Sequence, residues 1–245
     1  MKTYEQELLL RTCDCDFTGC WRPSAIMEAM QEMAGIHSYL IGCGREELLK
    51  QHIVWIMTRC EIHMLKYPRI GDRIKAQTFP TANRRWFFPR YYSFMSENGE
   101  ALGYAATLWA LLDIDSRRML PPGDVASILP DNSDLPLPMG LPATVDAIEG
   151  EERILRRIPS YFDLDVNQHV NNTRYADWAC DALGVDLMRD YCLESMLINF
   201  NAEITPDQPI MLHVSQNGLC YRVAGYHEDK LHFEVGGQLK KREDY

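Results

Sequence analysis

The segment Asp163-Leu-Asp-Val-Asn-Gln-His-Val-Asn-Asn172 gathers polar side chains in a chain of 245 residues that is 46% hydrophobic. Asp165, Asn167 and His169 alternate along it, so an extended backbone would turn all three to one face. Burying an acid, an amide and an imidazole together is costly, and such groups serve proton transfer and carbonyl polarisation. The alternative is that they only shape a turn and cap a helix. The alternation, followed by two more asparagines, favours a catalytic site.

A weaker copy of this segment lies near the N-terminus, so the chain is predicted to contain two related halves. Both copies precede a helical pattern and occupy the same place in the order of elements. The copy in the first half lacks the amide and the imidazole. The aligned pairs are Asp14 with Asp163, Asp16 with Asp165, Thr18 with Asn167, and Cys20 with His169.

Each half contains one helical pattern with an apolar stripe. The first helix is expected to start near Pro23, a favoured first-turn residue, and to end before Gly42. The second is expected to start near Asn171 or Asn172, whose side chains can cap free amides, and to end at Gly184.

Runs rich in β-branched and aromatic residues predict the strands. Asn98-Gly99 and Asn217-Gly218 each indicate a hairpin turn. The expected strands are residues 4–12, 53–65, 73–79, 86–95 and 102–114 in the first half, and 153–160, 196–203, 210–215, 219–227 and 231–237 in the second. The order β-α-β-β-β-β in each half predicts an α+β fold, with a long helix across a curled antiparallel sheet. Two such units in one chain could pair their sheets side by side.

Residues 121–150 are predicted to connect the halves over the surface. Six of the thirteen prolines lie between Pro121 and Pro142. Proline has no backbone N–H to donate, so this stretch is not expected to join a sheet. The predicted organisation is therefore an N-terminal unit at 1–120, a proline-rich linker at 121–150 and a C-terminal unit at 151–245.

Composition narrows the class of protein. The net charge of −10 argues against nucleic acid as the main partner and against a membrane-surface role. No apolar run approaches the ~20 residues of a membrane-spanning helix, and the N-terminal residues lack the pattern of a signal or transit peptide. A cytoplasmic protein is expected. The eight cysteines show no zinc-like spacing, so they are interpreted as reduced core residues and no metal site is predicted.

A second polar feature lies in the strand predicted at residues 196–203. Strand alternation would place Asn199, Asn201 and Glu203 on one face of a segment that should be buried. The alternative is that the strand ends near Thr205-Pro206 and that Glu203 is already in water. The six histidines other than His169 have no acidic or amide partner at a telling spacing, and we interpret them as structural or surface residues.

The chain resembles the acyl-ACP thioesterase family of plastid and bacterial enzymes. The segment at residues 163–172, with Tyr175 and Trp178 after it, is similar to the family's catalytic segment nearly residue for residue. The first half is similar to the family in the stretches His52-Ile-Val-Trp-Ile-Met-Thr-Arg59, Tyr67-Pro-Arg-Ile-Gly-Asp72 and Leu108-Trp109. The resemblance covers most of the chain, from about Tyr4 to about Gly237.

The resemblance implies a double hot-dog fold with the catalytic residues in the C-terminal unit. It implies hydrolysis of fatty acyl-ACP to free fatty acid and holo-ACP, with no metal or organic cofactor. The catalytic residues that it implies are Asp165, Asn167, His169 and Glu203. Many plant members carry Cys directly after that Glu. Ile204 stands there in this sequence, which excludes a thiol nucleophile at that position.

The resemblance also implies where the substrate binds. The acyl chain would lie in an apolar pocket of the N-terminal unit, and methionine suits such an adaptable pocket, although a methionine-rich helix is more often core. The candidate lining residues are Met27, Met30, Met33, Trp55 and Met57. Acyl carrier protein is strongly acidic, so basic residues should gather where it docks. The candidates are Arg84, Arg85, Arg90, Arg117, Arg118, Arg153, Arg156 and Arg157.

Three alternatives remain open at the level of the sequence. The protein could be an acyl-CoA thioesterase, or a non-catalytic acyl-binding protein of the same fold. Such a binding protein would be expected to lose the polar residues, as the first half has done at Thr18 and Cys20, whereas the second half retains them. A hydratase of the same fold is a weaker option. A homodimer is possible.

Overall fold

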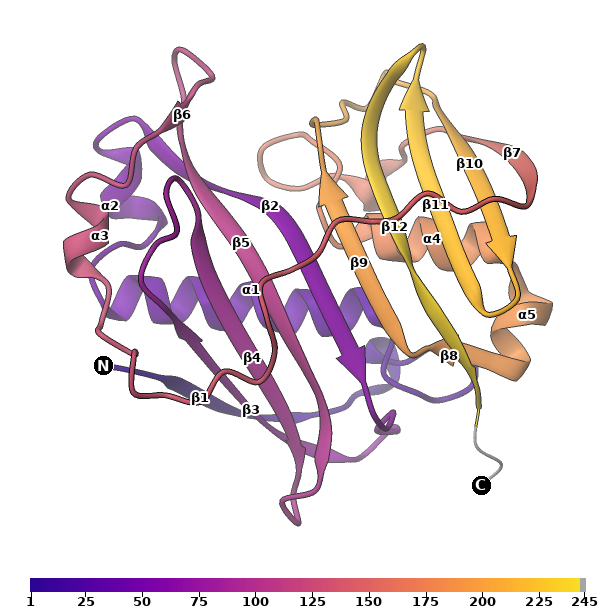
Figure 1. The fold of residues 1–245 in the computed structure, drawn as a ribbon, viewed down its shortest axis with the longest axis horizontal. Helices are drawn as coiled ribbons and strands as arrows, with labels where there is room; N and C mark the ends of the chain where they lie inside the picture. The colour runs from indigo at the N-terminus through magenta and orange to yellow at the C-terminus, as the bar shows by residue number, and fades with distance from the viewer. Residues whose placement is uncertain (243–245) are drawn as a thin grey trace. The chain divides into compact units, whose positions relative to one another are not determined.

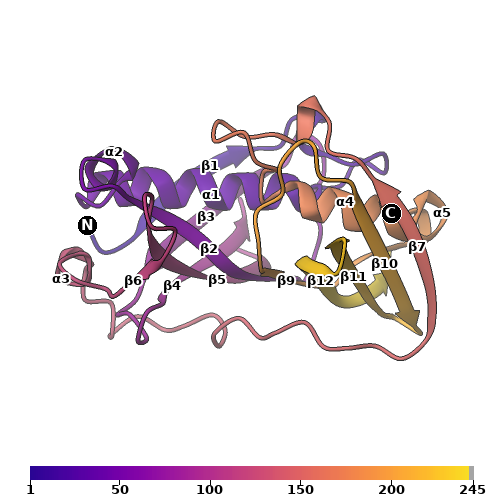
Figure 2. The same ribbon diagram turned by 90° about the horizontal axis from the view of Figure 1, so that it is seen from above.

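The computed structural model describes residues 1–242, which divide into two compact units. Unit 1 runs from Met1 to Pro142, and unit 2 begins at Ala143. Each unit contains an antiparallel sheet with its longest helix lying against one face (Figures 1 and 2). The prediction of an α+β fold with this element order in each half is confirmed.

Unit 1 is built on five main strands. Its sheet has the order β1-β3-β4-β5-β2, with the short β6 paired to β5. The strands are β1 (Tyr4–Leu9), β2 (Ile53–Met64), β3 (Arg73–Pro80), β4 (Phe88–Ser96), β5 (Ala101–Asp113) and β6 (Met119–Leu120). The helices are η1 (Thr12–Asp14), α1 (Pro23–Leu40), α2 (Arg45–Leu49) and α3 (Val125–Ile128).

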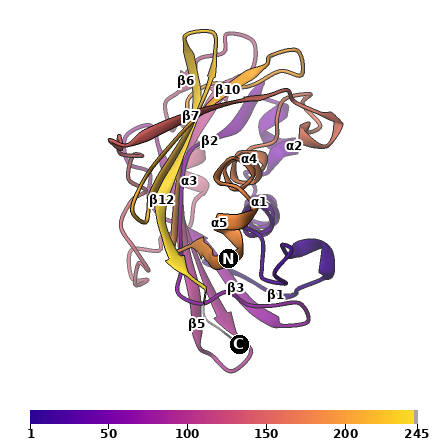
Figure 3. The same cartoon turned by 90° about the vertical axis from the view of Figure 1, so that its right-hand side faces the viewer.

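Unit 2 repeats this plan with shorter helices. Its sheet has the order β9-β12-β11-β10-β7, and the short β8 pairs with β12. The strands are β7 (Glu151–Arg157), β8 (Tyr191–Leu193), β9 (Ser195–Phe200), β10 (Ile210–Asn217), β11 (Cys220–His227) and β12 (Lys230–Lys241). The helices are η2 (Tyr161–Asp163), α4 (Arg174–Leu183) and α5 (Val185–Asp190). Figure 3 shows α4 end-on beside its sheet.

The two long helices end where the sequence predicts, but only α1 begins where it predicts. α1 begins at Pro23, as predicted. α4 begins at Arg174 rather than at the asparagines. The side chain of Asn171 accepts hydrogen bonds from the backbone N–H and the hydroxyl of Thr173 (3.0 and 2.9 Å), so it forms a turn that delays the helix. Gly184, with φ of 99°, ends α4 as predicted.

The core of unit 2 is an aromatic stack between α4 and the sheet. The rings of Tyr175 and Phe233 lie parallel with centroids 4.3 Å apart, and Trp178 packs against Phe233 at 6.0 Å. Gly225 faces Phe233 across the β11–β12 ladder, and a Cβ there would lie 2.1 Å from the Phe233 ring. Glycine is therefore required at this position, because it leaves room for the ring that supports α4.

The proline-rich segment is divided between the units, and its part up to Pro142 packs on unit 1. It contains α3, and Leu135 and Met139 pack on Phe79 and Tyr91. The Asn132 amide donates to the carbonyls of Lys2 and Pro80 (2.9 and 2.8 Å). In Figure 2 the part of this segment that belongs to unit 1 runs along the face of the unit 1 sheet opposite α1. No strand forms within residues 121–150, as its prolines predict.

Candidate active site

The polar motif forms a tight turn, not an extended strand. Leu164 and Val170 form a bridge, the Asp165 N–H donates to the His169 carbonyl (2.8 Å), and the Gln168 N–H donates to the Asp165 carbonyl (3.0 Å). Gln168 adopts φ of 63°, which reverses the backbone. The prediction that alternation along an extended chain places the three side chains on one face is therefore wrong.

The carboxylate of Asp165 holds this turn. One of its oxygens accepts hydrogen bonds from the backbone N–H of Asn167 (2.8 Å) and of His169 (3.3 Å). The other accepts from the Asn167 side-chain amide at 3.3 Å. Both groups that follow Asp165 are thus positioned by it. One N–H of the Asn167 amide remains for a further acceptor, since a side-chain amide carries two.

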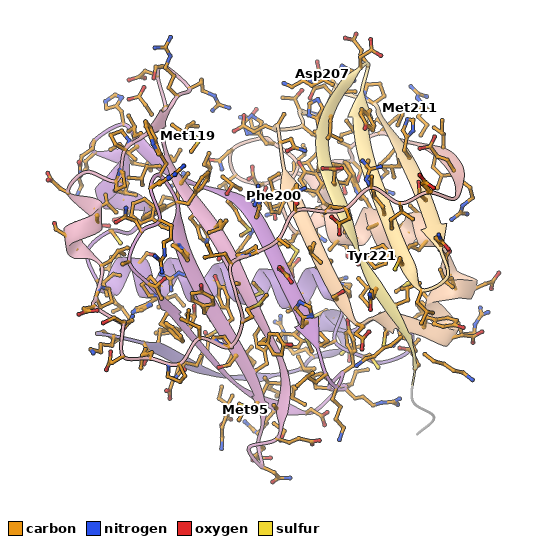
Figure 4. All side chains as sticks on the ribbon, viewed as in Figure 1. Met95, Met119, Phe200, Asp207, Met211 and Tyr221 are labelled. Atoms are coloured by element: carbon orange, nitrogen blue, oxygen red, sulfur yellow. The ribbon has the colours of Figure 1, made fainter. Side chains whose placement is uncertain are left out.

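Glu203 reaches the motif from a loop that follows β9. The strand ends at Phe200, so the prediction of a polar strand face that includes Glu203 is wrong, and the strand ends earlier than the alternative near Thr205 placed it. Figure 4 labels Phe200 and, farther along this loop, Asp207. The Val170 N–H donates to the Ile204 carbonyl (2.9 Å), which fixes the turn against the loop. This bond follows both His169 and Glu203 by one residue, so it brings these two side chains together.

His169 and Glu203 form an acid–base pair that solvent can reach. Their closest atoms, Nε2 of His169 and Oε2 of Glu203, lie 3.6 Å apart, and their side chains are 29% and 42% exposed. Tyr175 lies near the same carboxylates: burial raises the pKa of its phenol, and the charges of Glu203 and Asp165 raise it further. The imidazole of His169 and the carboxylate of Glu203 therefore meet near a buried aromatic residue.

Asp163 anchors the turn from below, a role that sequence reasoning missed. It is 3% exposed, and its Oδ2 accepts from the backbone N–H and the hydroxyl of Ser160 (2.6 and 2.7 Å). Its Oδ1 accepts from Trp178 Nε1 (3.0 Å), and its carbonyl accepts from the Asn171 N–H (2.7 Å). Burial is the largest single influence and opposes the charge of Asp163, but the hydrogen bonds from Ser160 and Trp178 and the charge of Arg157 together lower the pKa of the carboxyl.

The predicted acyl-chain residues lie in unit 1. The three methionines of α1 are at most 1% exposed, and Met57 is 5% exposed. Trp55 donates from Nε1 to the Cys43 carbonyl (3.0 Å) and packs edge-on against Phe88. Side chains in a closed core have the same burial, so a lining role stays a prediction.

One predicted docking residue is wrong, because Arg90 is only 5% exposed and cannot reach a partner protein. Its Nη atoms lie 3.1 Å from His37 Nδ1, 3.4 Å from the Thr78 hydroxyl and 3.3 Å from the Ser38 hydroxyl. His37 is itself buried; burial and the Arg90 charge lower its pKa to about 4. The guanidinium is therefore a core group, held by neutral acceptors.

The other predicted docking residues differ in accessibility. Arg157 is half-buried, lying 3.5 Å from Asp163, 3.4 Å from Asp181 and over the ring of Trp178. The exposed ones are Arg84, Arg85, Arg117, Arg118, Arg153 and Arg156. In unit 1, two of these arginines precede β4 and two follow β5. The antiparallel pairing of Phe88 with Trp109 puts these loops at the same end of the sheet.

The arrangement suits acid–base chemistry without a thiol. Ile204 is fully buried and has no nucleophilic atom. Among residues 1–242 the structure has no group of three or more His, Cys, Asp or Glu side chains able to hold a metal ion. What the site offers is a carboxylate and an imidazole close enough to exchange a proton through a bound group.

Comparison with known proteins places both halves in one family. The model of the acyl-ACP thioesterase N-terminal domain matches residues 1–126, and that of the C-terminal domain matches residues 149–241. A chloroplastic palmitoyl-acyl carrier protein thioesterase of Gossypium hirsutum is 28% identical, covering 74% of this chain and 47% of that protein. A dodecanoyl-[acyl-carrier-protein] hydrolase of Cinnamomum camphora is 23% identical over 88% of this chain and 60% of that protein. The chain thus spans about half to three-fifths of the length of these relatives.

Solved structures show the same fold. An acyl-ACP thioesterase from Bacteroides thetaiotaomicron superposes with a TM-score of 0.86 at 18% identity, covering 97% of this chain and 98% of that chain. The 12:0-ACP thioesterase from Umbellularia californica gives a TM-score of 0.81 at 19% identity over 98% of each chain. The fold is the double hot-dog that the sequence predicted.

Proposed function

Because the chain belongs to the acyl-ACP thioesterase family, we propose that it hydrolyses the thioester between a fatty acyl chain and acyl carrier protein. The observation that carries the proposal is the pair formed by His169 and Glu203, whose closest side-chain atoms lie 3.6 Å apart. The hydrogen bonds of Asp165 to Asn167 and to the backbone of His169 support a shared role for these residues. The relatives' names support the substrate class.

The proposed reaction begins with a water molecule between Glu203 and the substrate. Glu203 takes a proton from this water as its oxygen attacks the thioester carbonyl carbon. Asn167, whose amide has an N–H to spare, donates to the water or to the carbonyl oxygen. The tetrahedral intermediate then expels the pantetheine sulfur as the C–S bond breaks.

His169 is the proposed route by which the proton returns. The leaving thiolate needs one proton, and the water has already given one to Glu203. Since the two side chains lie 3.6 Å apart, His169 can pass that proton to the sulfur. The net change adds OH to the acyl group and H to the thiol. Asp165 takes no proton in this scheme, because its oxygens already bind the turn.

We place the acyl chain in unit 1 and the carrier protein on exposed arginines. The exposed pairs at residues 84–85 and 117–118 lie at one end of the unit 1 sheet, which supports a common docking surface. Replacing them by glutamate should weaken turnover of acyl-ACP at low salt, while turnover of an acyl-CoA of the same chain length is kept. Equal effects on both substrates would argue against carrier docking there.

The decisive experiment measures fatty acids released from a panel of acyl-ACPs and matched acyl-CoAs. The expected result is turnover of acyl-ACP by the protein, and a loss of at least about a hundredfold in kcat for Glu203→Gln. The variant should keep its fold, because Glu203 is 42% exposed. Preference for acyl-CoA would establish the alternative thioesterase, and binding without release would establish an acyl-binding protein.

No helix within residues 1–242 is long and apolar enough to cross a membrane.

The proposal also includes a homodimer formed through β7. This strand ends the order of the unit 2 sheet and pairs with β10 alone among the described strands. Glu152, Ile154 and Arg156 share one of its faces and are exposed. Antiparallel pairing of two copies about Ile154 would set Glu152 opposite Arg156 of the other copy.

Charge exchange tests this pairing. Glu152→Arg or Arg156→Glu alone should favour the monomer in light scattering, because like charges would then face each other. The double exchange should restore the dimer. A monomer at all protein concentrations, or single exchanges without effect, would reject the interface.

A further inference from the structure

The loop that carries Glu203 is fastened to the sheet at a single residue of β12. The N–H groups of Asn201 and Ala202 both donate to the carbonyl of His232, at 2.9 and 3.0 Å. In the other direction, Nδ1 of the His232 ring lies 2.8 Å from the carbonyl oxygen of Glu203. His232 thus contacts three consecutive residues of the loop, the last of which is the proposed base.

The strand changes its register at this residue. Gly225 pairs with Phe233 and Tyr226 pairs with Leu231, so His232 is the extra residue of a β-bulge. A bulge re-aims one side chain relative to a regular strand, and bulges are frequent beside active sites. Here the re-aimed side chain is an imidazole that is 1% exposed and directed at the Glu203 loop.

The chemistry of the ring argues for a specific role. A carbonyl accepts only from an N–H, so Nδ1 carries the proton, and burial keeps the ring neutral by lowering its pKa. Nε2 is then a bare acceptor, and it is buried without a hydrogen-bond partner. An orphaned acceptor of this kind costs stability, which an apolar residue would avoid. The bond to Glu203 is what the imidazole provides in return.

A neighbouring histidine holds the other end of the same loop. Nδ1 of His227 lies 3.0 Å from the carbonyl oxygen of Pro209. The rings of His227 and His232 are adjacent, with centroids 6.1 Å apart. The loop of residues 201–209 is therefore bounded by two imidazoles from the β11–β12 hairpin, one at each end.

We propose that His232 is a positioning residue for Glu203. By holding the Glu203 carbonyl, it fixes the backbone from which the carboxylate reaches His169. It touches no reacting atom itself. The inference rests on the proposed function, in which Glu203 is the base, and it assigns the bulge in β12 to the catalytic machinery.

The test compares His232→Leu with His232→Asn. Leucine removes the donor and the orphaned acceptor together, so its Tm should equal or exceed that of the wild type, while kcat on acyl-ACP falls about tenfold or more with KM little changed. Asparagine keeps an N–H near the position of Nδ1 and should recover most of the loss. The control is His213→Leu, which removes a half-buried histidine paired with Glu152 and should leave kcat unchanged.

Two readouts separate positioning from packing. In His232→Leu the pH dependence of kcat/KM should shift, because the base has moved relative to His169, and amide hydrogen exchange at residues 201–204 should accelerate. Unchanged kcat, pH profile and exchange would overturn the proposal. A loss of activity that follows Tm and is not rescued by asparagine would also overturn it. Should leucine prevent folding, His232→Phe keeps the ring volume and replaces it.

The exchange measurement needs no substrate, so it distinguishes the two hypotheses. If the wild-type protein releases no fatty acid from any acyl-ACP, the proposed function fails. Faster exchange at residues 201–204 would then still show that His232 holds the loop, and unchanged exchange would show that it does not.

Discussion

The turn that carries His169 has a counterpart in unit 1. The two turns have the same pattern of backbone hydrogen bonds. The Asp16 N–H donates to the Cys20 carbonyl at 2.8 Å, as that of Asp165 does to the carbonyl of His169. The N–H of the next residue donates to a second loop in both units: Trp21 to Pro68, and Val170 to Ile204, each at 2.9 Å. The aligned aspartates even accept from the same place, the N–H two residues on, at 2.8 Å.

Only side chains distinguish the two turns. Thr18 stands in the place of Asn167 and donates its hydroxyl to Asp16 (2.6 Å). Cys20, at 5% exposure, replaces the more exposed imidazole. Tyr67 precedes Pro68 where Glu203 precedes Ile204. The aspartate and its turn are therefore features of the hot-dog unit itself. The proposed chemistry depends instead on the positions of Asn167, His169 and Glu203, which have other residues in unit 1.

The largest effect is expected when the side chains of the unit 2 turn are replaced by those of the unit 1 turn. The double variant Asn167→Thr with His169→Cys gives unit 2 the turn of unit 1. We expect kcat on acyl-ACP to fall at least about a hundredfold, because the acid–base group is lost. The free energy of unfolding should change little, since a threonine hydroxyl can donate to Asp165 as Thr18 does to Asp16. Steady-state kinetics and urea unfolding measure the two effects.

The control places the proposed catalytic amide in the unit 1 turn. Thr18→Asn should leave kcat unchanged, because the unit 1 turn has Cys20 and Tyr67 in the places of His169 and Glu203. Full activity of the double variant would show that the family's residues are not used as proposed.

The local features of this fold could be predicted from the sequence. Pro23 and Gly184 mark helix ends through their own backbone preferences, and the Asn-Gly pairs mark two hairpins for the same reason. The alignment of Asp16 with Asp165 was also visible, because repeated geometry requires a repeated residue. These signals lie within a few residues of what they determine.

The rest of the site depends on contacts that no short pattern records. Alternation placed Asp165 and Glu203 on strand faces, whereas a reverse turn and a strand end place them in fact. Arg90 was predicted to be a surface charge, but its place in β4 buries it in the core. His232 carries no signal at all, since a bulge arises from the pairing of two strands. Sequence reasoning proposed the catalytic residues but gave no role to Asp163 or His232, which hold the turn and the loop.

Asp14 and Asp163, which lie two residues before Asp16 and Asp165, are expected to stabilise the two turns to different extents. Asp163 is buried among Ser160 and Trp178, whereas Asp14 is paired mainly with the exposed Arg11. Asp163→Asn should therefore lower the free energy of unfolding by about 2–3 kcal/mol, and Asp14→Asn by less than about 1 kcal/mol. Urea unfolding at pH 7 gives both values. Equal losses would mean that burial does not distinguish the anchors.

The carboxyls of Asp14 and Asp163 also predict how the free energy of unfolding depends on pH. The Arg11 guanidinium lowers the pKa of Asp14, and hydrogen bonds from Ser160, acting against burial, lower that of Asp163. A carboxyl with a lowered folded-state pKa stabilises the protein above its unfolded pKa of about 4, and this is lost as pH falls through the folded value. Stability should therefore drop below about pH 4, less steeply in Asp163→Asn. An unchanged slope in that variant would contradict the assignment.

Removing the turn-holding aspartates should separate stability from activity. Asp16→Ala and Asp165→Ala each delete hydrogen bonds to two backbone N–H groups, so each should lower the free energy of unfolding by about 1–2 kcal/mol. Only Asp165→Ala should also lower kcat, because Asn167 and His169 lose their orientation. If both variants keep full activity, the turn is not needed to position the base and its partner.

The smallest difference between the turns is the residue that reverses the backbone. Gly19 has φ of 80° and Gln168 has φ of 63°, both in the left-handed region that costs a side-chain-bearing residue about 1 kcal/mol. Gly19→Ala should lower the free energy of unfolding by about that amount. Gln168→Gly should raise it by less, because glycine also gains freedom in the unfolded chain. Calorimetry detects both changes. If Gln168→Gly lowered stability instead, the glutamine side chain would be making a contact that favours its strained backbone, and the two turns would differ in their frame as well as in their chemistry.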